Sequence, residues 1–80
     1  MKITVKLFAT FRDYLPQDAV NGAFGVELEA KRTVRELIQT LSLPEDIPKI
    51  VLVNGRQTEE ESELQAGDTV SIFPPLAGGR

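Results

Sequence analysis

Only one segment of this 80-residue chain repeats its apolar residues with the period of a helix, and that restricts the folds open to it. The apolar stripe of this segment, at the spacing i, i+3, i+4 and i+7, consists of Val34, Leu37, Ile38 and Leu41. Thr33 and Glu36 are spaced as a capping box, in which the hydroxyl and the carboxylate each satisfy a free backbone N–H. Proline at position 44 cannot continue the helical hydrogen bonds. The sequence therefore predicts a single helix that begins at Thr33 and ends before Pro44.

The other apolar segments alternate as half-buried strands do. Strands are predicted over residues 2–8, 23–30, 49–53 and 69–73, with a short return strand over 56–58 and a helical turn over 9–15. Asn21-Gly22 and Asn54-Gly55 are turn signals. One helix among several strands predicts a two-layer α+β domain, in which the helix stripe covers one face of the sheet.

Composition argues against an enzyme, because the sequence has no Cys and no His. It therefore lacks a thiolate metal site and the usual general base near neutral pH, and no metal ligand set is expected. The net charge of −3 and the pI of about 4.8 argue against nucleic-acid binding. No apolar run reaches the roughly 20 residues that span a membrane. We expect one cytoplasmic domain over residues 1–80.

Residues 59–63 form an acidic run, Glu-Glu-Glu-Ser-Glu. Such a run favours either a solvated loop or a calcium site, but it lacks the alternating ligands and the glycine of a calcium loop. The sequence therefore predicts a solvated loop that Leu64 anchors to the core.

The carboxyl end carries a recognisable pattern. Residues 67–79 read Gly-Asp-Thr-Val-Ser-Ile-Phe-Pro-Pro-Leu-Ala-Gly-Gly, and the N-terminal segment has Leu-Phe-Ala at 7–9. With Val-Asn-Gly at 53–55, this pattern resembles the MoaD/ThiS family of ubiquitin-like sulfur carriers, and the length suits the MoaD branch. The resemblance implies a β-grasp fold of four to five strands, with the first and last strands parallel and central.

The same resemblance implies a protein co-substrate that binds no cofactor itself. An E1-like adenylyltransferase would use ATP to adenylate the carboxylate of Gly79, and a sulfur donor would convert it to a thiocarboxylate. In the MoaD branch this sulfur serves molybdenum or tungsten pterin synthesis, with the large subunit of molybdopterin synthase as a further partner. The sequence leaves thiamine, a tRNA or a protein open as the final acceptor. A ubiquitin-like modifier or interaction module without sulfur transfer is the alternative.

Residues 74–80 are expected to form an exposed, flexible tail that enters a partner. Proline stiffens its start at Pro75, Leu76 and Ala77 follow, and Gly78 lets a narrow channel approach the backbone. Arg80 departs from the family pattern, in which the second glycine ends the chain. Three explanations stay open: a protease removes Arg80, the chain no longer carries sulfur, or arginine itself ends the working tail. We favour removal.

Phe8 and Phe73 have the opposite strand parity to the inward residues Leu7 and Ile72. With one helix covering one face, both rings are expected on the open face, close to the tail. Exposed aromatic residues are frequent anchors of protein interfaces, so this pair is predicted to be a docking patch. The sequence also leaves Lys6 and Arg12 as candidates for contacts with an acidic partner.

Overall fold

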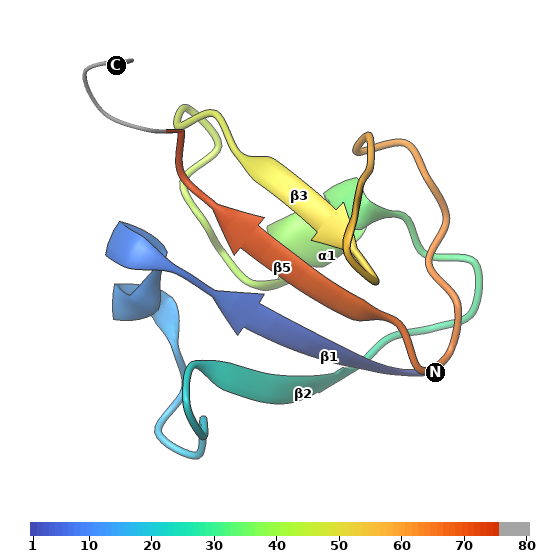
Figure 1. The fold of residues 1–80 in the computed structure, drawn as a ribbon. Helices are drawn as coiled ribbons and strands as arrows, with labels where there is room; N and C mark the ends of the chain where they lie inside the picture. Colours follow the sequence, from blue (N-terminus) through green and yellow to red (C-terminus); the bar gives the residue numbers. More distant parts are fainter. Residues whose placement is uncertain (76–80) are drawn as a thin grey trace.

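The computed structural model describes residues 1–75, which form one mixed sheet with a single α-helix across one face (Figure 1). The elements in chain order are β1 (Lys2–Leu7), the 3₁₀-helix η1 (Ala9–Tyr14), β2 (Ala23–Glu27), α1 (Val34–Thr40), β3 (Ile50–Val53), β4 (Arg56–Gln57) and β5 (Thr69–Phe73). The sheet order is β2-β1-β5-β3-β4. Strands β1 and β5 pair in parallel at the centre, and the other neighbours are antiparallel. This is the topology that the β-grasp resemblance implied.

The core lies between α1 and the sheet face that α1 covers. The inward residues of the two central strands are fully buried: Ile3, Val5 and Leu7 of β1, and Val70 and Ile72 of β5. The helix contributes Val34, Leu37 and Ile38. Phe11 of η1 and Leu64 of the long loop also belong to this core, and the sequence predicted that Leu64 would anchor its loop there.

Four predicted strands were too long at one end: β1 and β4 each end one residue earlier than predicted, and β2 and β3 differ as follows. Strand β2 was expected to continue to Ala30 but ends at Glu27, which pairs with Lys2 at the start of β1. Because β1 begins at Lys2, no strand residue lies opposite Leu28. The Leu28 N–H instead donates to the Met1 carbonyl at 2.8 Å. Strand β3 begins at Ile50, which pairs with Phe73, the last residue of β5.

The acidic segment 59–63 does more than extend into solvent. Its backbone carbonyls at Ser62 and Glu60 accept the N–H groups of Val34 and Arg35, at 3.0 and 2.9 Å. These N–H groups belong to the first turn of α1 and have no partner inside the helix. The Arg35 guanidinium also pairs with Glu60 at 3.3 Å and with Glu61 at 2.8 Å. The loop is solvated and anchored by Leu64, as predicted, and its carbonyls also bind the start of the helix, which its charge did not indicate.

The capping box at Thr33 is present as predicted. The Glu36 N–H donates to the Thr33 hydroxyl at 3.2 Å, and the Thr33 N–H donates to the Glu36 carboxylate at 2.9 Å. The Glu36 carboxylate also pairs with Arg32 at 2.9 Å. The bond from the Thr33 N–H, followed by the bond from Arg32, lowers the pKa of Glu36.

This lowered pKa predicts how Glu36 contributes to stability. The contribution is present above the pKa of an unfolded glutamate, about 4.3, and is lost as the pH falls through the lower folded value. In Glu36→Gln the amide oxygen still accepts the Thr33 N–H but does not titrate. We expect the variant to lose less stability than the wild type between pH 5 and pH 3, as urea denaturation at several pH values will measure. Equal losses would contradict the role given to Glu36.

Candidate functional site

The two phenylalanines that the sequence placed outside the core stack on each other. Their ring centroids are 4.2 Å apart and the planes are inclined by 12°. The parallel register sets Leu7 beside Ile72, and the Phe8 N–H donates to the Ile72 carbonyl at 3.2 Å. Phe8 and Phe73, the next residues along each strand, thus lie side by side on the face that α1 leaves open. Both are half-buried, in part by each other.

Strand β3 adds two apolar residues that the sequence prediction missed. Ile50 lies directly across from Phe73, and Leu52 lies across from Ser71, so both share the open face. Ile50 is 37% exposed and Leu52 is half-buried. Their signal was present in the sequence: a strand whose four residues are all apolar must show two of them to each face. We call Phe8, Phe73, Ile50 and Leu52 the open-face cluster.

A cation lies beside this cluster. Lys6 precedes Phe8 by two residues on the same face of β1 and pairs with Ala23 on one side and Ser71 on the other. Neither neighbour is charged, and within residues 1–75 the cations that form ion pairs are Arg32 and Arg35, so Lys6 forms none. The open face therefore offers an apolar centre with an exposed ammonium group next to it.

The chain leaves the sheet at this cluster. Strand β5 ends at Phe73, Pro74 is half-buried and Pro75 is exposed. Neither proline has a backbone N–H, so neither can extend the pairing with a neighbouring strand. The other predicted tail residues, Leu76, Ala77, Gly78, Gly79 and Arg80, lie outside the described residues, and their roles stay predictions.

Two of the motifs that carried the family resemblance meet in space. The Asn54 amide donates from Nδ2 to Asp68 Oδ1 at 2.9 Å and accepts the Thr69 N–H at 2.9 Å. The other Asp68 oxygen accepts the Gln65 N–H at 2.8 Å. The Asn-Gly turn after β3 is thus fastened to the Gly-Asp turn before β5. These motif residues hold two turns of the fold together.

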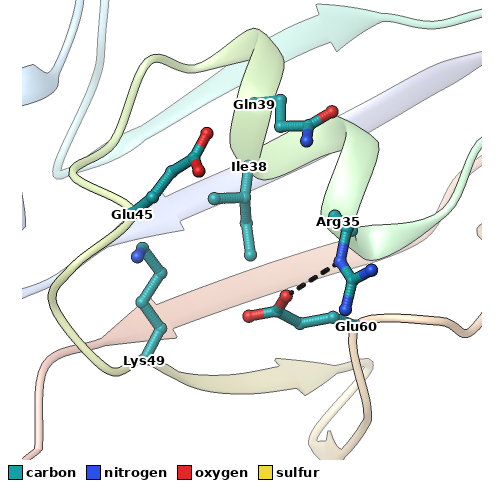
Figure 2. Close-up of a pocket in the computed structure, with 6 residues that line it drawn as sticks. All are labelled: Arg35, Ile38, Gln39, Glu45, Lys49 and Glu60. Atoms are coloured by element: carbon teal, nitrogen blue, oxygen red, sulfur yellow. Dashed lines mark hydrogen bonds and ion pairs between the residues drawn. The ribbon is translucent and has the colours of Figure 1, made fainter.

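A hollow lies beside α1, and none of its lining residues belongs to the open-face cluster (Figure 2). It has a volume of about 120 Å³ and is lined by Arg35, Ile38, Gln39, Glu45, Lys49 and Glu60. Its cations are already engaged: Arg35 pairs with Glu60, and the Lys49 ammonium donates to the carbonyls of Pro44 and Ile47. With two cations and two carboxylates the lining is electrically balanced, and it presents no catalytic pair.

Comparison with known proteins identifies the family. A model of the ThiS family matches residues 5–79. Small archaeal modifier protein 3 of Haloferax volcanii is 29% identical over 96 residues, covering 99% of this chain and all of that protein. A putative molybdopterin converting factor, subunit 1, from Pyrococcus furiosus is 31% identical, with a TM-score of 0.73 over 94% of this chain and 98% of that one.

A complex of subunits 1 and 2 of the molybdopterin-converting factor from Helicobacter pylori contains the same fold. The match has a TM-score of 0.64 at 20% identity, covering 99% of this chain and 100% of that one. Within the described part of the chain, no helix has the length and apolar character needed to cross a membrane. The family match covers nearly the whole sequence and the strand order agrees with it, so the chain belongs to the ThiS family and has the ubiquitin-like β-grasp fold.

Proposed function

We propose that this protein is a sulfur carrier whose working group is the carboxylate of Gly79. The observation that carries the proposal is the extent of the family match, which includes Gly78 and Gly79 and stops before Arg80. The residues that the family shares thus end at the glycine whose carboxylate would be activated. Arg80 ties up that carboxylate in a peptide bond, so a processing protease must remove it first.

The proposed chemistry takes place in a partner, because this chain has no Cys or His to perform it. A carboxylate oxygen of Gly79 attacks the α-phosphate of ATP in an E1-like adenylyltransferase, and pyrophosphate leaves. Hydrosulfide supplied by a sulfur donor then attacks the acyl carbon and AMP leaves, which gives the thiocarboxylate with no change of oxidation state. The chain supplies a substrate group and holds no cofactor.

The acceptor that fits the similarity best is a pterin on the way to the molybdenum or tungsten cofactor. The support is the Pyrococcus furiosus relative, which is a putative molybdopterin converting factor, subunit 1. The second partner would then be the large subunit of a molybdopterin synthase, as subunit 2 accompanies subunit 1 in the Helicobacter pylori complex. ATP–pyrophosphate exchange with the chain ending at Gly79 tests the activation step.

The open-face cluster is the proposed docking surface for the activating enzyme. It lies where β5 ends, so an enzyme that covers it also receives the tail. Replacing both Phe8 and Phe73 by Ser removes the stacked anchor, and we expect affinity for the E1-like enzyme to fall by about thirtyfold or more. Isothermal titration calorimetry will measure the affinity.

Thr4→Ala is the matched control for this double variant. Thr4 is exposed on the same face of β1 and lies outside the cluster, so its loss is expected to leave binding unchanged. Thermal denaturation of both variants shows whether each remains folded at the titration temperature. Wild-type affinity in a folded double variant would rule out the cluster as the docking surface.

A second function, protein modification, is favoured by the modifier from Haloferax volcanii. Activation at Gly79 would be the same, but a lysine amine of a target would attack the acyl group in place of sulfur. The two functions leave different products. A thiocarboxylate replaces one oxygen by sulfur in the free chain, whereas modification leaves the Gly79 carbonyl in an isopeptide bond. Mass spectrometry of the protein from its native cells distinguishes them.

A further inference from the structure

The chain contains two Asn-Gly dipeptides, and the structure gives them nearly the same backbone. The φ angles are 53° and 79° at Asn21 and Gly22, and 53° and 86° at Asn54 and Gly55. Positive φ at both central residues is the condition for the tight type I′ turn that Asn-Gly favours. Any difference in chemical behaviour between the two dipeptides must therefore come from their side chains and surroundings.

The Asn54 side chain is held at both ends. Its Nδ2 donates to the Asp68 carboxylate and its Oδ1 accepts the Thr69 N–H, both at 2.9 Å. A carboxylate only accepts and an N–H only donates, so these partners also fix which end of the amide is nitrogen. To rotate its side-chain carbonyl carbon toward the Gly55 nitrogen, Asn54 has to break both bonds.

The Asn21 side chain has no such restraint. The residue is exposed, and the side-chain hydrogen bonds found within residues 1–75 include the Asn54 amide but not the Asn21 amide. The turn itself is closed by backbone bonds between Val20 and Ala23, at 2.9 and 3.0 Å, and these bonds do not involve the side-chain amide. Gly22 is buried beside the Arg12 guanidinium, but it has no side chain of its own to obstruct the approach of its nitrogen to the Asn21 amide.

We infer that Asn21 is a site of spontaneous deamidation and backbone isomerisation, from which Asn54 is protected. The Gly22 nitrogen loses its proton to base and attacks Cγ of Asn21. The new N–C bond closes a cyclic imide, and the side-chain nitrogen leaves as ammonia. Water then opens the imide at either carbonyl and gives aspartate or isoaspartate. Water is the only co-reactant, and nothing is oxidised or reduced.

The modification falls close to the open-face cluster. The Gly22 carbonyl accepts the Leu7 N–H at 3.1 Å, and Leu7 immediately precedes Phe8. Isoaspartate lengthens the main chain of the turn by one methylene group, and both products add a negative charge. The proposed modification is thus a slow covalent change of the turn beside the end of β1, and it does not depend on which partners the protein has.

Peptide mapping by mass spectrometry of the full chain, incubated folded in mildly alkaline buffer, tests the proposal. We expect Asn21 to react about thirtyfold faster than Asn54, the factor that corresponds to two hydrogen bonds of ordinary net strength. In concentrated denaturant the two dipeptides are expected to react at similar rates. Equal rates in the folded chain would overturn the proposal, as would a denatured chain that kept the thirtyfold difference.

The variant Asp68→Ala tests the protecting contact, and it also removes the acceptor of the Gln65 N–H. It removes the acceptor of the Asn54 amide, so the Asn54 rate is expected to rise by about fivefold or more, as for one lost hydrogen bond. Asn21 serves as the reference inside the same molecules, because general loosening of the fold acts on both turns. A rise of both rates by the same factor would overturn the role given to Asp68.

Discussion

A chain that ends at Gly79 is expected to support ATP–pyrophosphate exchange by an E1-like enzyme, and a chain that keeps Arg80 is expected to give only the background rate. The reason is chemical: adenylation needs a free carboxylate on the glycine, and the peptide bond to Arg80 removes it. The arginine side chain also adds bulk and positive charge beyond Gly79, the last residue that the family match covers. The effect should be close to all or none, measured as labelled pyrophosphate entering ATP.

Two controls separate activation from docking. A chain ending at Gly78 presents a free carboxylate one residue too early, and we expect it to exchange poorly because the tail no longer reaches the nucleotide. A chain ending at Gly79 with Phe8→Ser and Phe73→Ser tests the open-face cluster under the same assay. Full exchange by the chain that retains Arg80 would show that trimming is unnecessary and that arginine itself can end the working tail.

Replacing Leu37 by Ala is expected to remove about 2–5 kcal/mol of folding free energy. Leu37 is fully buried on the side of α1 that faces the sheet, and alanine would leave a cavity there. Alanine favours the helix, so the loss reports packing alone. Small domains are commonly stable by about 5–15 kcal/mol, which makes this a large fraction of the total. Urea denaturation followed by circular dichroism measures it.

Gln39→Ala is the matched control, on the same helix but exposed. It introduces the same residue without a cavity, and its effect is expected to stay within about 0.5 kcal/mol. A Leu37 variant as stable as the Gln39 variant would mean that the helix stripe does not hold the core together.

The local features of the fold could be read directly from the residues. The capping box at Thr33, the 3₁₀ segment with Phe11, and both Asn-Gly turns are present where local sequence placed them. Each depends on contacts between residues a few positions apart, so the sequence specifies them with little help from the rest of the chain. Strand ends were less accurate, since a strand stops where its partner does, as Glu27 stops opposite Lys2.

The behaviour of the acidic segment required the tertiary structure. Its charge predicted a solvated loop, and the side chain of Glu61 is indeed exposed. Yet the segment's carbonyls cap the first turn of α1, a pairing across more than 20 residues that no local pattern reveals. The meeting of Asn54 with Asp68 is of the same kind.

The candidate site divides in the same way. Sequence parity placed Phe8 and Phe73 on the open face, because that inference needs only the alternation of a strand. The role of Gly78 and Gly79 was inferred from the family resemblance and stays a prediction. That the two rings stack, and that Ile50 and Leu52 extend them, depended on the parallel pairing of β1 with β5 and on the register of β3. Register is a long-range property, set when the helix and the sheet close over one core, and only the folded chain decides it.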